Sequence, residues 1–235
     1  MPKIRLDVKG LSGPGRGLHY PGRMHKFEPG YEDPARLLAE AAVCAEVEDD
    51  RRHQLIGRLH RRSDAAAFLA AAEAAKAADL ELRLVAVEVL GQLGYAGGRP
   101  YREETLAILI QELDQAEDPR LLQAAITALA HLGDGRALTP LLRHAHHRDD
   151  GVRRAVAFAL PSITDQENPA PEVVDALIEL SRDADGATRD WSTFGLAELL
   201  EADSPEIRAA LTARLDDADA IAAQARAGLS RRSAD

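Results

Sequence analysis

From residue 33 onward, apolar residues recur every three to four positions, which is the spacing of amphipathic helices. The pattern is also self-similar at a longer period. When six leucines are aligned as one position, the intervals between them are 31, 39, 31, 36 and 33 residues, the length of two short helices with their turns. These reference leucines are Leu59, Leu90, Leu129, Leu160, Leu196 and Leu229. The pattern predicts an all-α domain over residues 33–235, with about five to six helix pairs.

A rotation of roughly 100° per residue sorts the second helix of each pair into two faces. Positions −8, −4, −1, 0 and +3 from each reference leucine form the predicted core face, which ends at +3 with Leu93, Leu132, Ile163 and Leu199. Positions −6, −2 and +2 point the opposite way, and we call them the inner stripe. The inner stripe includes Glu88, His131, Arg154, Phe158, Asp190, Phe194 and Glu198.

Charged residues repeat with the leucines. An acid stands eleven residues before the reference leucine in five repeats, at Glu48, Asp79, Asp118, Asp149 and Asp185. An arginine stands seven residues before it in four, at Arg52, Arg83, Arg153 and Arg189. The acid is placed to cap the second helix, and the arginine to pair with that acid or with its counterpart in the next repeat. Proline also recurs just inside the expected helix starts, at Pro34, Pro119, Pro171 and Pro205.

The segment D-D-G-V-R-R-A-V-A-F-A-L, Asp149 to Leu160, resembles the second helix of HEAT repeats of the phycobilisome (PBS) lyase type, roughly D-x-x-V-R-x-x-A-x-x-A-L. Looser versions end near Leu90 and Leu196, so the resemblance covers about residues 35 to 230. It implies a right-handed α-α superhelix whose second helices line the concave side. Such repeats serve lyases, adaptors, scaffolds and some DNA glycosylases, so the resemblance specifies the fold better than the activity.

The first 32 residues differ from the rest. Residues 10 to 30 hold six glycines and three prolines, and Ile4, Leu6 and Val8 alternate with polar residues. This composition predicts an extended or partly disordered arm over residues 1–32. Residues 1–31 carry about +4, against about −14 for the remainder.

Composition and charge narrow the classes of function. A hydrophobic fraction of 46% with only 4% aromatic residues favours packed helices over a sheet sandwich. No apolar run is long enough to span a membrane, so we expect a cytoplasmic protein. The net charge of −10 disfavours nucleic-acid binding and suits a basic partner. The sequence leaves the oligomeric state open.

Trp191 is the one tryptophan, five residues before Leu196, between the core face and the inner stripe. Either it packs at the edge of an adjoining repeat, or it joins Phe158 and Phe194 in an aromatic patch that binds a partner. Phe158 and Phe194 in turn either form a binding surface, or they cover a repeat junction or pack under the N-terminal arm.

Catalytic chemistry has little support in the residues. His144, His146 and His147 lack a carboxylate at metal-ligand spacing, and Cys44 is alone, so we expect no metal, no cofactor and no thiol chemistry. The leading hypothesis is a non-catalytic module that binds another protein on its concave face as an adaptor, scaffold or immunity-type protein. A bilin lyase, and behind it a HEAT-type DNA glycosylase, are the enzymatic alternatives.

Overall fold

The computed structural model describes residues 32–44 and 50–233. Residues 1–31, which make up nearly all of the predicted arm, lie outside the described residues, as does the predicted capping residue Glu48. In the described ranges the chain is helical and contains no strand. The all-α prediction is confirmed.

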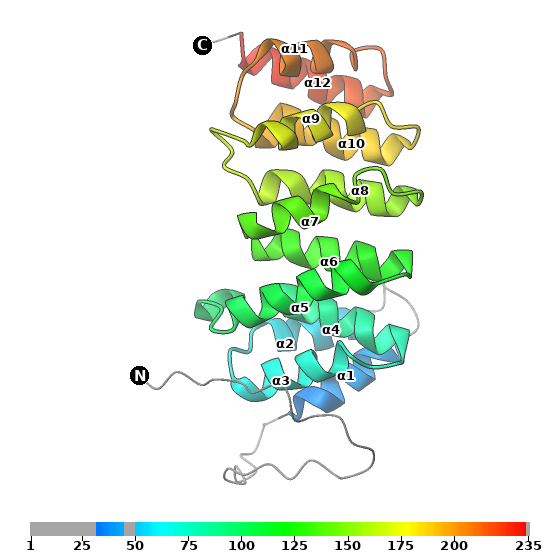
Figure 1. Cartoon of the computed structure of the whole chain (residues 1–235), viewed down its shortest axis with the longest axis vertical. Helices are drawn as coiled ribbons and strands as arrows, with labels where there is room; N and C mark the ends of the chain where they lie inside the picture. The colour runs from blue at the N-terminus through cyan, green and yellow to red at the C-terminus, as the bar shows by residue number, and fades with distance from the viewer. Residues whose placement is uncertain (1–31, 45–49, 234–235) are drawn as a thin grey trace. The chain divides into compact units, whose positions relative to one another are not determined.

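The twelve helices of the described chain form six consecutive pairs (Figure 1). The first helices of the pairs are α1 (Pro34–Ala42), α3 (Ala65–Ala74), α5 (Arg102–Gln115), α7 (Leu138–Leu142), α9 (Pro171–Leu180) and α11 (Pro205–Thr212). The second helices are α2 (Asp50–His60), α4 (Leu80–Gln92), α6 (Pro119–Leu132), α8 (Asp150–Ala159), α10 (Gly186–Phe194) and α12 (Asp219–Arg231). None of the helices in the described ranges is both long and apolar enough to cross a membrane.

Side-chain caps fix where the second helices begin. The carboxylate of Asp79 accepts a hydrogen bond from the backbone N–H of Leu82, and Asp149 does the same for Val152. Asp118 and Asp185 cap α6 and α10. Each carboxylate satisfies an amide that the helix leaves without a partner, and its charge meets the positive end of the helix dipole.

The second helices build the inner layer of the stack. They pack closely on one another in the order α4, α6, α8, α10, α12, whereas successive first helices after α3 contact each other much less. Small residues allow this approach: a Cβ on Gly91 of α4 would lie 2.6 Å from the Cα of Ala128 in α6. Closer spacing on one side makes the helix pairs fan out on the other, which is the curvature of a superhelix.

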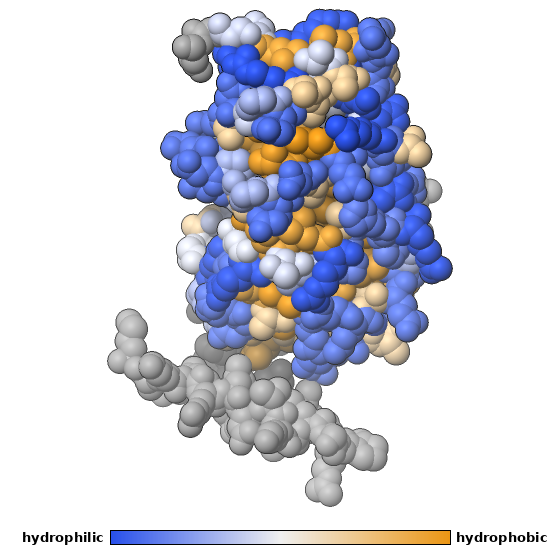
Figure 2. Space-filling model, turned by 45° about the horizontal axis from the view of Figure 1, so that its top comes forward, coloured by the Kyte–Doolittle hydropathy of each residue, from blue (hydrophilic) through white to orange (hydrophobic). Residues whose placement is uncertain are grey.

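The predicted core face is buried along most of the stack. Leu59, Leu90, Leu129, Leu160 and Leu196 are each at most 1% exposed. Leu229, in the last helix pair of the described chain, is half-buried. Figure 2 shows apolar residues in interrupted bands between strongly hydrophilic residues on the face in view.

One core prediction at position +3 is wrong. Leu199 was expected in the core at position +3, but it is half-buried, and Leu200 takes the core position with 2% exposure. The cause is a π-helical turn over Gly195–Leu199, in which the N–H of Leu200 donates to the carbonyl of Gly195 at 2.9 Å. A π turn holds one more residue than an α turn, so it shifts the following side chains around the axis.

Candidate partner-binding face

Four rings of the second helices form a continuous row. His131 of α6 and Phe158 of α8 lie 6.0 Å apart between ring centroids. Phe158 and Trp191 of α10 lie 5.1 Å apart, and Trp191 and Phe194 6.0 Å apart, both edge to face. Such edge-to-face contacts are favourable for aromatic rings. We call these residues the aromatic row.

Trp191 combines the two environments that the sequence left open, packing against an adjoining repeat and a place in an aromatic patch. Its ring packs edge to face on Phe158 of the preceding repeat, and it is still 37% exposed, one of the few large apolar side chains exposed in the described chain. Its indole N–H forms no hydrogen bond with the described residues, so it remains available to an acceptor. Phe158 is half-buried and packs against the core.

The acids of the inner stripe are occupied by neighbours within the chain. Glu88 pairs with Arg52 of the preceding repeat at 2.9 Å. Asp190 accepts a hydrogen bond from the Gln224 amide at 3.1 Å. Glu198 similarly pairs with Arg231 at 3.3 Å. Arginines therefore offset the charges of Glu88 and Glu198, whereas Asp190, held by a neutral amide, keeps its negative charge.

The arginine of the stripe is in the opposite situation. Arg154 forms no ion pair with the described carboxylates, and its charge acts on the capping residue Asp185, whose pKa it helps to lower. It lies one helical turn before Phe158, on the same face of α8. A cation whose charge is partly offset by the Asp185 carboxylate thus stands one helical turn from Phe158 of the aromatic row.

The repeated arginines connect each repeat to the next. Arg153 donates to both oxygens of Asp183, at 2.7 and 2.8 Å, and Arg189 donates to both oxygens of Asp217, at 2.9 and 3.1 Å. Arg83 reaches Glu112 at 2.7 Å. The arginines therefore pair across repeats and leave the caps to their helices. Hydrogen bonds from the guanidinium groups lower the pKa of Asp183 and Asp217.

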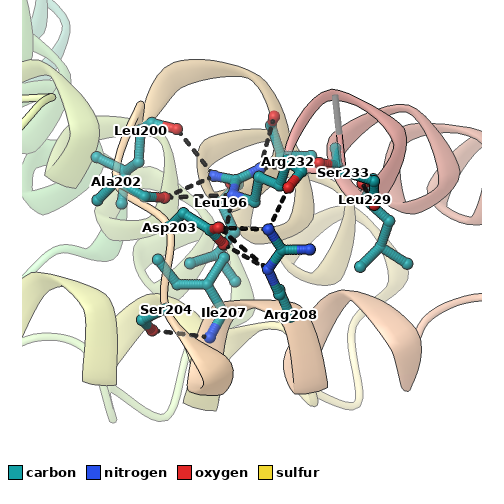
Figure 3. Close-up of polar contacts among 12 residues, drawn as sticks. Leu196, Leu200, Ala202, Asp203, Ser204, Ile207, Arg208, Leu229, Arg232 and Ser233 are labelled. Carbon is teal, nitrogen blue, oxygen red and sulfur yellow. Dashed lines mark hydrogen bonds and ion pairs between the residues drawn. The ribbon is translucent and has the colours of Figure 1, made fainter. Parts of the chain in front are cut away.

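Arg232 closes the C-terminal end and was not singled out from the sequence. Its guanidinium donates to the carbonyls of Leu196 at 2.7 Å, Leu200 at 2.9 Å and Ala202 at 3.0 Å (Figure 3). The Leu196 carbonyl lies within the π turn and those of Leu200 and Ala202 follow it, at the end of the helix, where the chain supplies no further helical N–H. The backbone carbonyl of Arg232 itself accepts from Arg208. Nothing in the sequence distinguishes Arg232 from the exposed Arg231 that precedes it, so no sequence signal indicates this contact.

The remaining candidates for chemistry are the histidines around His144, whose ring centroid lies 6.2 Å from that of His147, and Cys44. His146 contacts Glu179 at 3.3 Å, and His147 accepts from the backbone N–H of Asp149 at 3.1 Å. Across residues 32–44 and 50–233, no group of three or more His, Cys, Asp or Glu is placed to hold a metal ion. Cys44 is half-buried against the core, and its thiol donates to the Glu40 carbonyl at 3.3 Å.

Comparison with known proteins gives likenesses in sequence and in fold. The sequence-family model for HEAT repeats matches residues 69–161 and 106–197, which together span more than half of the chain. No curated protein matches in sequence. The solved structure of YibA from Escherichia coli is similar with a TM-score of 0.64 at 20% identity, covering 87% of this chain and 77% of that one.

Two further structures share the fold. A designed armadillo repeat protein in complex with the peptide (KR)4 has a TM-score of 0.57 at 15% identity, covering 85% of this chain and 99% of that one. The CpcE and CpcF complex of phycocyanin lyase from Nostoc has a TM-score of 0.53 at 22% identity, covering 70% and 99%. With the repeat signature, the paired helices and the matching family model, the chain belongs to the HEAT-repeat family.

Proposed function

We propose that the protein is a non-catalytic interaction module that binds another protein on the inner face of its second helices. The observation that carries the proposal is the aromatic row, which leaves Trp191 37% exposed beside Phe158 and Phe194. Exposed tryptophan is costly to leave in water, and buried tryptophan is among the strongest anchors in protein interfaces.

The rigidity of the row supports the same role. The rings come from three consecutive second helices, so their spacing is set by packed backbone and not by loops. A preformed surface loses little conformational freedom on binding. The designed armadillo protein that shares this fold holds a short peptide, which indicates that a solenoid of this type can present an extended binding surface.

Capture from native lysate tests the proposal. The bait is the full chain, the variant is the triple alanine change at Phe158, Trp191 and Phe194, and the matched control is the triple alanine change at Val43, Leu69 and Tyr95. The control removes the other exposed large apolar side chains of the described chain. We expect a partner that the control retains and the aromatic-row variant loses, with both variants as helical as the wild type. Equal capture by all three would reject this face.

A second candidate is a bilin-binding protein, favoured by the likeness to the CpcE and CpcF complex of phycocyanin lyase. Trp191, which is 37% exposed, offers an apolar ring against which a tetrapyrrole can stack. A shift in bilin absorbance on mixing with the wild type, absent with the triple aromatic variant, would support it. An unchanged spectrum removes this candidate and leaves the interaction module.

A further inference from the structure

A groove separates the first helices of the last two helix pairs in the described chain. α9 and α11 contact each other less than the second helices α10 and α12 do, and the groove lies between the N-terminal ends of α9 and α11. Its volume is about 510 Å³, within the roughly 300–1,000 Å³ of typical small-ligand sites. None of the rings of the aromatic row lines it, so it is a separate surface.

The groove has apolar lining and fixed walls. Val174 of α9, Ile207 of α11 and Ala202 line it, and all three are buried or half-buried. The backbone N–H of Glu201 donates to the Gln166 carbonyl at 2.8 Å, which ties the segment before α11 to the loop before α9. A preformed groove loses little conformational freedom when a partner fills it.

The charged residues of the groove are all acidic. No Lys, Arg or His lines it, and its carboxylates are Glu167, Asp175, Asp203 and Glu206. Asp203 accepts from Arg208 at 2.8 Å (Figure 3). The other three are exposed and form no ion pair with the described residues. A hydrogen bond from the neutral Ser204 hydroxyl lowers the pKa of Glu206, so this group keeps its negative charge at neutral pH.

An earlier junction of first helices shows what this one lacks. At the N-terminal ends of α5 and α7, Arg136 donates to both oxygens of Glu103, at 2.8 and 2.9 Å. Within the described chain no ion pair joins α9 to α11. Beyond their C-terminal ends Arg214 donates to the Ser181 carbonyl at 2.7 Å, and their N-terminal ends present carboxylates without a bridging cation.

The surrounding stretch of chain carries charge of the same sign. Residues 164–233 contain 15 Asp and Glu against seven Arg, with no Lys or His, which gives a net charge of −8. A surface of one sign attracts segments of the opposite sign and repels those of its own. The groove is therefore complementary to a basic segment, both locally and in the wider field.

We propose that the groove between α9 and α11 binds a short basic segment of a partner protein, with an apolar side chain on its apolar lining and Lys or Arg side chains on its three unpaired carboxylates. This inference goes beyond the proposed function, because the groove uses none of the aromatic row. Burial of the apolar side chain contributes affinity, and the carboxylates orient the segment and speed its association.

Fluorescence anisotropy of end-labelled peptides, titrated with the full chain at low ionic strength, tests the site. The probes are Lys-Arg-Leu-Arg-Lys, the same peptide with Glu at every basic position, and the basic peptide with Ser in place of Leu. We expect saturable binding of the first, none of the Glu peptide, and weaker binding of the Ser peptide. Equal affinity for the Leu and Ser peptides would mean attraction of any polycation, and overturns the groove as the site.

Two groove variants and one control locate the binding. Asp175→Asn and Glu206→Gln should each weaken the Leu peptide about threefold to fivefold, the size expected of exposed ion pairs. Asp216→Asn is the control, because Asp216 is exposed in the same acidic stretch but does not line the groove. It should leave the affinity unchanged within about 1.5-fold. Equal losses in all three variants, binding of the Glu peptide, or no binding of the Leu peptide overturns the inference.

The triple alanine variant of the aromatic row separates this surface from the proposed function. It should bind the Leu peptide as the wild type does. Loss of the peptide in that variant would place it on the row and overturn the groove, whereas failure of the groove variants alone leaves the capture experiment to decide on the row.

Discussion

Phe158 lies near the end of α8 and Leu160 directly after that helix, and their side chains have different environments. Leu160 is fully buried, whereas Phe158 is half-buried between His131 and Trp191. We expect Leu160→Ala to reduce the free energy of unfolding by about 2–5 kcal/mol, through lost burial and a cavity. Phe158→Ala should cost about 1–2 kcal/mol, since part of its surface is already in water.

Urea unfolding followed by circular dichroism measures both changes, and Leu129→Ala provides a second core reference. If Phe158→Ala costs as much as the leucine changes, Phe158 belongs to the core and is not part of a binding face.

Arg231 and Arg232 are neighbours in sequence, but we expect their side chains to contribute very different amounts to stability. Arg232 is 5% exposed in its side chain and satisfies carbonyls that have no other donor, whereas Arg231 is 48% exposed and pairs with Glu198 at 3.3 Å. Arg232→Ala should cost about 3–5 kcal/mol, because buried carbonyls lose their charged donor. Arg231→Ala should cost less than about 1 kcal/mol. Thermal unfolding of the two variants decides, and equal melting temperatures would contradict the role of Arg232.

At the scale of elements, the spacing of the second helices depends on Gly91. A Cβ there would lie 2.6 Å from the Ala128 Cα, so α4 and α6 must separate in Gly91→Ala. We expect a loss of about 1–3 kcal/mol from this overpacking. Gly57 of α2 is the matched control, because its added Cβ would meet nothing closer than 3.7 Å. Gly57→Ala should be neutral or stabilise by up to about 1 kcal/mol. Destabilisation by both changes would point to a general effect of alanine instead.

The sequence predicts these elements well where a local rule decides. A carboxylate eleven residues before a leucine identifies the caps at Asp79, Asp149 and Asp185, because capping depends on neighbouring residues only. The partner of Arg153 is set by where the next repeat turns: the sequence offered the capping acid Asp149 or its counterpart Asp185, and the structure instead pairs Arg153 with Asp183. Arg232 and the π turn depend on each other in three dimensions, and neither has a local signature.

At the scale of the whole array, stability depends on contacts between adjacent repeats. The pKa values of Asp183 and Asp217 are lowered by their arginines. A carboxylate whose pKa is lower in the folded than in the unfolded state stabilises the folded state. This stabilisation is complete above the unfolded-state pKa and is lost as the pH falls through the folded-state pKa. Coupling between repeats should therefore weaken below about pH 4, near the ordinary carboxylate pKa.

Urea unfolding at pH 7 and pH 3 tests this dependence. For the wild type we expect a lower midpoint and a shallower, less cooperative transition at the acid pH. Asp183→Asn should already lose about 1–3 kcal/mol at neutral pH and show a smaller further loss on acidification. An acid response as large as that of the wild type would mean that other carboxylates dominate.

The position of Trp191 shows where prediction for the whole molecule ends. Helical periodicity placed it between core and inner stripe, and the structure indeed gives it a neighbour in the preceding repeat as well as exposure. Which ring it would meet depended on the rotation of α8 relative to α10, a property of stacked repeats and not of either helix. The residues of the inner stripe could be predicted from the sequence, but the ring contacts between neighbouring helices could not.

The π turn at Gly195–Leu199 also affects how this chain is compared with its relatives. It inserts one residue into a repeat without adding a turn of helix, so the fifth repeat is out of phase with the others from Gly195 onward. An alignment of repeats that allows no gap there will match Leu199 with Leu93, Leu132 and Ile163, although Leu200 occupies their position in space. A family profile built on such an alignment would blur the end of the second helix and miss the carbonyls that Arg232 binds.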